Sequence, residues 1–203
     1  MKIADEDKRV STEWAFARYE QVRHRLPGAS FPACSIHAPD LLAVADHFDG
    51  FILDAFGVLN VGETALPGAV ERITQLRTLG KQLIVLTNGA THKLNQVTAK
   101  YRALGFDFNR NEVVASRQVA ARRLNQIAPD AKWGVIGGPG DNFDDLAVES
   151  IDLVEAQDAF NRVDAFLFLS SARWNSHLQR ELNDSLIAKP RPLIIANPDL
   201  VAP

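Results

Sequence analysis

The sequence predicts an α/β fold in which a partial, Rossmann-like core with a parallel sheet is followed by a second α/β domain. Short apolar runs at residues 51–53 and 83–86 each end in a polar, glycine-containing turn, and one helical pattern lies between them. Continuous apolar runs of this length are typical of parallel strands that are covered on both faces. Strands and helices then continue to alternate up to residue 196, which is the pattern of an α/β protein.

Residues 1–47 are expected to form a helical extension. Residues 12–26 have the spacing of an amphipathic helix that ends at Pro27. Its apolar stripe consists of Ala15, Tyr19, Val22 and Leu26. A second, short helix is expected at residues 41–47, directly before the first strand.

Residues 48–90 are expected to form the core. Its helix is predicted to hold Pro67 in the first turn, where a missing N–H costs nothing, and to end at Gly80 in a left-handed conformation. A strand–helix–strand unit of this kind is expected to have a right-handed crossover. Asp54 and Thr87, which follow the two strands, should therefore lie at the same edge of the sheet, where ligands bind in such folds.

Asp54 and Thr87 together suggest a phosphoryl site. A carboxylate can attack phosphorus, and a hydroxyl group with backbone amides can hold the phosphate oxygens. Thr87 and the turn residues Asn88 and Gly89 supply such groups. The alternative is that Asp54 only caps the turn that follows it.

Two motifs carry a resemblance to a known family. Residues 54–59, Asp-Ala-Phe-Gly-Val-Leu, resemble the first motif of the haloacid dehalogenase (HAD) superfamily, and residues 86–89, Leu-Thr-Asn-Gly, resemble its second motif. The spacing, and the helix start at residues 66–69, resemble the NagD-like phosphatases (class IIA), which carry a large inserted cap domain. The resemblance runs from about residue 48 to residue 203.

The resemblance implies a Mg²⁺-dependent phosphatase of a small phosphorylated metabolite. Asp54 would be the nucleophile of an aspartyl-phosphate mechanism. Thr87, Asn88 and Gly89 would hold the phosphoryl group. Mg²⁺ would be bound by the Asp54 carboxylate, the backbone carbonyl of Phe56 and a later acid, and it prefers such oxygen ligands.

The sequence departs from the family in two ways. The family's phosphatases have a second aspartate, a general acid/base, at the position of Phe56. No match to the family's later lysine and acidic motif precedes Pro203, and residues 197–203 are expected to start the return to the core. The sequence therefore predicts a truncated chain that is inactive as it stands.

Phe56 leaves two alternatives open. An aromatic residue at this position resembles the metal-independent haloacid dehalogenases, which attack carbon. The other alternative is a non-catalytic binding protein that has kept the fold. A metal-dependence assay separates the first alternative from a phosphatase, and ligand binding without turnover would favour the second.

Residues 91–196 are expected to form the cap. Helices are predicted at residues 92–104, 116–127, 142–147 and 175–187, and strands at 133–136, 151–154, 165–169 and 193–196.

Other candidate sites in this region lack support from the sequence. Gly138 and Gly140 would open a dinucleotide fingerprint, but its third glycine falls on Phe143. The histidines lack metal-ligand spacing. Asp144-Asp145 and Asp199 could bind a cation, although paired acids in a loop are usually solvated, and Ser170-Ser171 lacks the glycine frame of a nucleophile elbow.

Composition excludes several classes of function. The net charge of −3 gives no electrostatic case for nucleic acid. No apolar run reaches the length of a membrane span, and the charged N-terminus does not resemble a signal peptide. Cys34 is the only cysteine and is expected to be an apolar filler, so a cytoplasmic location is predicted. An uncovered strand at residues 51–53 would allow pairing with a second copy, so a homo-oligomer is conceivable.

Overall fold

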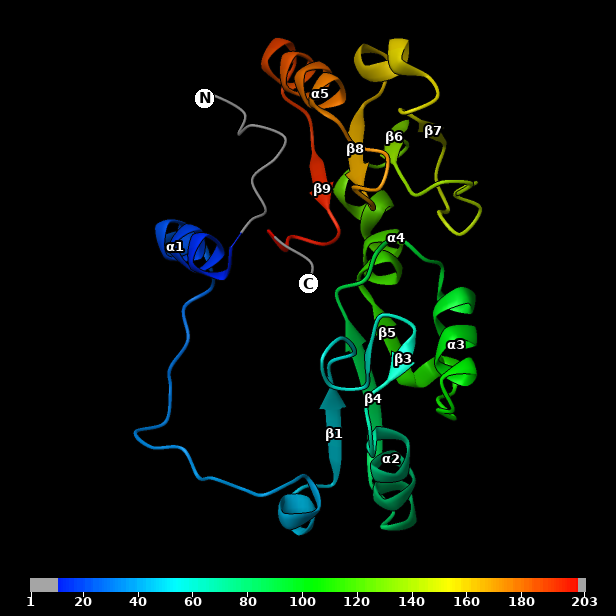
Figure 1. The fold of residues 1–203 in the computed structure, drawn as a ribbon. Coiled ribbons are helices and arrows are strands. Elements are labelled where there is room, and N and C mark those ends of the chain that lie inside the picture. Colours follow the sequence, from blue (N-terminus) through cyan, green and yellow to red (C-terminus); the bar gives the residue numbers. More distant parts are fainter. Residues whose placement is uncertain (1–10, 201–203) are drawn as a thin grey trace. The chain divides into compact units, whose positions relative to one another are not determined.

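The computed structural model describes residues 11–200, which form two units (Figure 1). The smaller unit consists of residues 11–38 and 198–200, and the larger unit is Pro39–Asn197. No helix in this described part of the chain combines the length and apolar character that crossing a bilayer requires.

The smaller unit is built on helix α1, Thr12–Val22, which is followed by the 3-10 helix η1, Arg23–Arg25. Ser11 caps α1, because its side chain accepts a hydrogen bond from the Trp14 amide (3.2 Å). Of the expected apolar stripe only Ala15 is buried. Cys34 is exposed, so the expectation that it fills an apolar space is wrong.

The first sheet of the larger unit has three parallel strands in the order β1-β4-β5. These are β1 (Gly50–Leu53), β4 (Gln82–Thr87) and β5 (Val113–Ala115). The 3-10 helix η2, Leu42–His47, precedes β1 as expected. A small antiparallel hairpin, β2 (Asn60–Val61) with β3 (Thr64–Ala65), follows the turn after β1 and was not expected.

Within residues 39–197, helices cover only one face of the first sheet. Leu53 and Val85 are buried in a core shared with helix α2, Ala69–Thr78, and helix α3, Leu94–Ala103. On the other face Ile52 is 72% exposed. Since side chains alternate between the two faces of a strand, this contrast follows from the register.

The second sheet has four parallel strands in the order β7-β6-β8-β9. They are β6 (Trp133–Ile136), β7 (Ser150–Asp152), β8 (Ala165–Phe168) and β9 (Leu193–Ile195).

Helices cover both faces of the second sheet. Helix α4, Ser116–Ile127, packs over one face, and helix α5, Ser176–Ala188, packs with the 3-10 helix η4, Gln157–Asn161, over the other. The middle strands β6 and β8 are buried almost throughout. This sheet therefore has a complete core of its own.

Three expectations from the sequence need correction. The chain passes from the first sheet to the second between β5 and β6, whereas the sequence predicted this change after residue 90. The difference arises because β5 and the preceding 3-10 helix η3, Arg110–Glu112, were not predicted. Pro67 lies outside α2, which is capped by Gly68 in a left-handed conformation. Residues 142–147 form a loop instead of a helix.

Candidate phosphate site

The structure places Asp54 and Thr87 at neighbouring strand ends. Strands β1 and β4 are parallel, and Leu53 lies opposite Val85. Asp54 follows β1 directly, and Thr87 is the last residue of β4. Asp54 is exposed and Thr87 is half-buried. Both side chains are therefore held at the carboxyl edge of the first sheet, as the sequence predicts.

The turn after Asp54 is fixed by one backbone carbonyl. The Ala55 oxygen accepts hydrogen bonds from the amides of Val58 (3.3 Å), Leu59 (2.8 Å) and Asn60 (3.1 Å). Gly57 has φ +80°, a conformation that favours glycine. The turn is thus defined by backbone contacts and by the buried side chain of Leu59.

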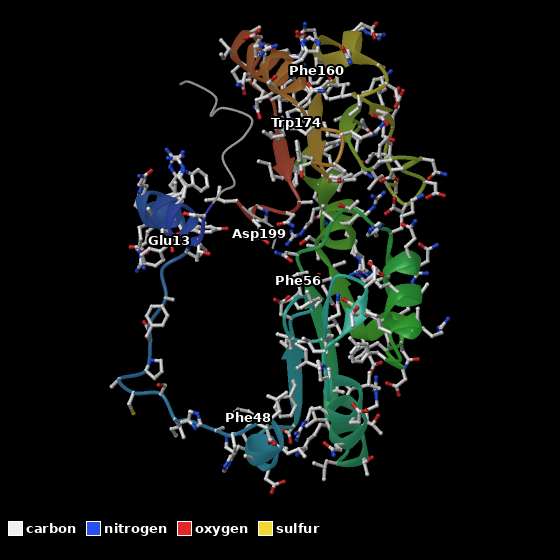
Figure 2. The ribbon with its side chains drawn as sticks, viewed as in Figure 1. Glu13, Phe48, Phe56, Phe160, Trp174 and Asp199 are labelled. Atoms are coloured by element: carbon white, nitrogen blue, oxygen red, sulfur yellow. The ribbon has the colours of Figure 1, made fainter. Side chains whose placement is uncertain are left out.

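Phe56 lies in this turn and is 40% exposed (Figure 2). It forms an isolated bridge with Asn60. The two bonds of the bridge run from the Gly57 amide to the Asn60 oxygen (2.9 Å) and from the Asn60 amide to the Ala55 oxygen. Neither bond uses the Phe56 carbonyl, so that oxygen can accept from, or coordinate, another group.

The turn after Thr87 carries a hydrogen bond that a ligand would compete for. The Gly89 amide donates to the Thr87 hydroxyl oxygen at 3.2 Å. On the other strand the Ala55 amide donates to Asp54 Oδ1 at 2.7 Å. Each polar side chain at this edge is thereby oriented by the turn that follows it.

Tyr101 of α3 interacts electrostatically with the Asp54 carboxylate. Burial in the apolar core raises the pKa of the Tyr101 phenol to about 12, and the Asp54 carboxylate adds to this. This neighbour could not be predicted from the sequence, because the spacing of Tyr101 indicates only an apolar helix face.

Loops that follow strands of the second sheet contact Thr91, four residues after Thr87. The Thr91 hydroxyl lies 3.2 Å from the hydroxyl of Ser170, which follows β8. A Cβ atom on Gly138, which follows β6, would come within 3.0 Å of the Thr91 side chain. Gly138 therefore allows close packing against Thr91, which accounts for this glycine without the dinucleotide role that the sequence did not support.

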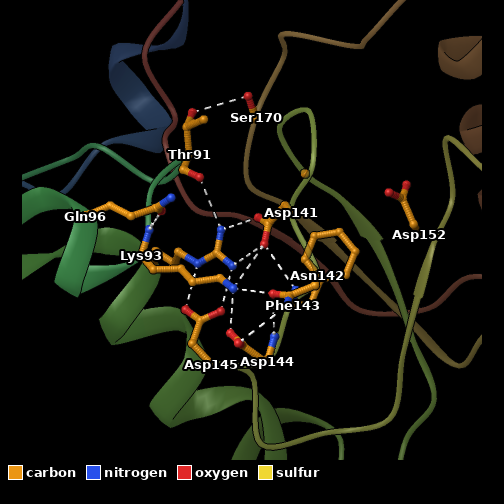
Figure 3. A network of polar contacts seen from close by, with 12 residues as sticks. Thr91, Lys93, Gln96, Asp141, Asn142, Phe143, Asp144, Asp145, Asp152 and Ser170 are labelled. Carbon is orange, nitrogen blue, oxygen red and sulfur yellow. Dashed lines mark hydrogen bonds and ion pairs between the residues drawn. The ribbon is translucent and has the colours of Figure 1, made fainter.

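A buried ion-pair network lies beside this contact (Figure 3). Arg117, in the first turn of α4, has a side chain that is only 1% exposed. It donates to Asp141 (2.5 and 3.0 Å) and to Asp145 (2.6 and 2.7 Å), and also to the Thr91 carbonyl (3.3 Å). One guanidinium thus joins α4, the loop after β6 and the chain that follows the candidate phosphate turn.

The network keeps both partners charged. Burial alone would raise the pKa of Asp141, but hydrogen bonds from Arg117 and from the Phe143 amide lower it. Burial alone would lower the pKa of Arg117, but hydrogen bonds to Asp145 and Asp141 raise it. The Asp141–Phe143 bond also explains the missing helix, because an aspartate that binds a backbone amide two residues on favours a turn.

The structure also shows the partners of Asp144 and Asp145, which the sequence analysis considered as ligands of a cation. Asp144 and Asp145 are paired with Lys93 and Arg117 respectively, so they are not merely solvated. Within residues 11–200 no group of three or more His, Cys, Asp or Glu side chains could hold a metal ion. The oxygens of Asp54 and Phe56 are the ones that fit a cation bound mainly by substrate and water, as Mg²⁺ often is.

Comparison with known proteins agrees with this architecture. The family of haloacid dehalogenase-like hydrolases matches residues 51–148. A chloroplastic phosphoglycolate phosphatase of Arabidopsis thaliana is 36% identical over 97 residues, 47% of this chain and 27% of the relative. A glycerol-3-phosphate phosphatase of Gallus gallus is 38% identical over 99 residues, 48% of this chain and 32% of the relative.

The solved structure of a glycerol phosphate phosphatase from Mycobacterium tuberculosis, in complex with magnesium, is also similar. It has a TM-score of 0.61 and 26% identity, and the match covers 79% of this chain and 47% of that one. In each of these comparisons the match spans less than half of the relative's length.

Fold and strand pairing thus define an α/β protein with parallel sheets and a haloacid dehalogenase-like fold. The chain is similar to the haloacid dehalogenase-like hydrolases over just under half of its length, and it shares its fold with NagD from Escherichia coli (TM-score 0.58, 20% identity, 76% of this chain and 58% of that one).

Proposed function

We propose that this protein is a Mg²⁺-dependent phosphatase of a small phosphate ester, with Asp54 as the nucleophile. The observation that carries the proposal is the pairing of β1 with β4, which holds Asp54 and Thr87 at one sheet edge in a chain similar to the haloacid dehalogenase-like hydrolases. Relatives that are named as phosphatases of phosphoglycolate and glycerol 3-phosphate support the class of substrate.

In the proposed mechanism an Asp54 oxygen forms a bond to phosphorus as the bond to the leaving oxygen breaks. The resulting aspartyl phosphate is then hydrolysed by water. Thr87 and the amides of Asn88 and Gly89 hold the phosphate oxygens. To do so, the Gly89 amide gives up its hydrogen bond to the Thr87 hydroxyl and donates to a phosphate oxygen instead.

The Asp54 carboxylate and the Phe56 carbonyl would hold Mg²⁺. Both are oxygen donors at the same strand end, and Asp54 is exposed. When bound, Mg²⁺ supplies positive charge that offsets the repulsion between the Asp54 carboxylate and a phosphate.

Phe56 makes this phosphatase slow. A phenyl ring cannot protonate the leaving oxygen, and general acid catalysis contributes about 10²–10⁴-fold. The second α/β sheet is proposed to act as the cap.

The test is hydrolysis of 4-nitrophenyl phosphate with and without Mg²⁺. Asp54→Asn should abolish turnover and leave the fold intact, because the amide is isosteric but a poor nucleophile. Phe56→Asp should raise turnover by restoring a proton donor. Full activity in Asp54→Asn would show that Asp54 is not the nucleophile.

Phe56 also favours a second candidate, a binding protein that keeps the fold without catalysis. Saturable phosphate binding with no turnover in either the parent chain or Phe56→Asp would support it. A metal-independent dehalogenase activity is separated from both candidates by assaying a haloacid without Mg²⁺. A cytoplasmic location and self-association through β1 stay predictions from the sequence.

A further inference from the structure

We propose that the site selects phosphate esters whose leaving group is uncharged and carries hydroxyl groups, over esters whose leaving group carries a carboxylate. This inference rests on the proposed function and narrows its substrate class. It is argued from the rim of the second sheet, which is here called the lip: residues 91–93, the loop 137–145 after β6 and the loop 170–173 after β8.

The lip begins close to Thr87 along the chain. Thr91 follows Thr87 by four residues, which span at most about 14 Å. Thr91 in turn contacts Ser170 and lies against Gly138. A leaving group that extends from a phosphate at residues 87–89 toward the second sheet therefore meets these loops first.

Every cation of the lip, or reaching into it, has a carboxylate partner in the structure. Lys93 donates to Asp144 and also to Asn142. Arg117 is buried between two aspartates, as described above. These bonds direct the charged groups toward residues 141–145 of the loop after β6 (Figure 3).

Arg173, in the loop after β8, is neutralised in the same way. It donates to Asp152 (2.5 Å) and Glu155 (2.8 Å), and to the Gly137 carbonyl (3.1 Å). A substrate carboxylate would have to displace one of these protein carboxylates to gain an ion pair.

Carboxylates outnumber cations in these clusters. Three cations, Lys93, Arg117 and Arg173, meet five carboxylates, those of Asp141, Asp144, Asp145, Asp152 and Glu155. The clusters therefore carry two excess negative charges. A second anionic group on the substrate would be repelled, and repulsion of this kind is an effective means of discrimination.

The lip does offer neutral hydrogen-bonding groups. The Thr91 and Ser170 hydroxyls meet each other, the Ser170 oxygen accepts from the Ala172 amide (3.3 Å), and Ser171 is exposed. Hydroxyl groups both donate and accept, so they match a hydroxylated leaving group.

The inference is tested by calorimetric titration of the full chain, in the presence of Mg²⁺, with four probes. These are inorganic phosphate, glycerol 3-phosphate, 2-phosphoglycolate and phosphoethanolamine. Glycerol 3-phosphate should bind about tenfold or more tightly than 2-phosphoglycolate, an effect within the range that the juxtaposition of like charges gives.

A matched pair of variants isolates the electrostatic cause. Asp144→Asn removes one negative charge and releases Lys93, so it should narrow the gap between the two esters. Asp158→Asn makes the same change of charge at an exposed ion pair on η4 and should leave the gap as it is.

The outcomes separate the inference from the proposed function. Equal affinity for glycerol 3-phosphate and 2-phosphoglycolate, a preference for 2-phosphoglycolate, or weaker binding of the cationic phosphoethanolamine than of 2-phosphoglycolate overturns the inference and leaves the proposed function standing. An unchanged gap in Asp144→Asn also overturns it. Failure to bind any of the four probes overturns the proposed function, and the inference with it.

Discussion

The two sheets of the larger unit are built from the same kind of strand but are covered differently. The second sheet has helices on both faces, and Phe166 and Leu167 of β8, on its opposite faces, are fully buried. The first sheet has helices on one face only, and Ile52 of β1 and Leu86 of β4 are 72% and 51% exposed on the other. The candidate phosphate site stands on the less covered sheet.

Within this unit, the residues that contribute most to stability are therefore different from those of the candidate phosphate site. The free energy of burial scales with the apolar area removed from water, so each middle-strand residue of the second sheet contributes more than its counterpart on the open face of the first. Asp54 and Thr87, the residues of the candidate phosphate site, are held by strand pairing and by turns instead.

The largest expected effect is on the core of the second sheet. Phe166→Ala should lower the free energy of unfolding by about 4 kcal/mol, because it leaves a cavity between β8 and its covering helices. Ile52→Ala on the open face should cost less than about 0.5 kcal/mol, as exposed substitutions usually do. Urea unfolding of both variants measures the difference, and equal costs would refute the contrast.

The next effect concerns the buried guanidinium beside the site. Arg117→Met should cost about 3 kcal/mol, because it removes the closest cation of Asp141, whose side chain is only 6% exposed. The control Arg162→Met breaks an exposed pair with Asp158 and should cost less than about 1 kcal/mol. If the two variants unfold at the same urea concentration, the ion pairs of Arg117 do not stabilise the fold more than an exposed ion pair does.

A smaller effect is expected on the pH dependence of stability. The pKa of Asp141 is lower in the folded protein than in the unfolded chain, despite its burial, because of its bonds to Arg117 and the Phe143 amide. Its contribution is therefore fully present above the unfolded value of about 3.9 and is lost as the pH falls through the folded pKa.

Asp141→Asn should accordingly flatten the fall in unfolding free energy below about pH 5. The measurement is urea unfolding of the parent chain and the variant over a series of pH values. A variant that keeps the parent slope would show that Asp141 is not held in its charged form by this network.

Much of this architecture is predictable because apolar runs and helix periodicity are local signals. Helix α4 and strand β6 have the bounds that the sequence predicts, and Asp54 and Thr87 lie at adjacent strand ends as expected. Strand β5 was missed because it is only three residues long and has no turn residues between it and α4.

The ion-pair network could not be read from the sequence. Arg117 lies 24 residues from Asp141 and 28 from Asp145, and an arginine in an amphipathic helix usually points to solvent. The only feature of the sequence that indicated such a network was the acidic run after the glycine-rich turn. Which cation pairs with these carboxylates can be known only from the fold. The loop at residues 142–147, where a helix was expected, follows from the hydrogen bond that the Phe143 amide donates to Asp141.

The central claim is that the edge formed by Asp54 and Thr87 binds phosphate, and the most direct measurement is an NMR titration. Inorganic phosphate, added with Mg²⁺ to the ¹⁵N-labelled chain, should shift the amide signals of Asn88 and Gly89 saturably. Thr87→Val should weaken this binding about tenfold or more, since it removes a hydrogen bond to a charged ligand. The control Thr78→Val, at an exposed position of α2, should bind as the parent does. Unmoved Asn88 and Gly89 signals, or a Thr87→Val variant with the affinity of the parent chain, would contradict the account.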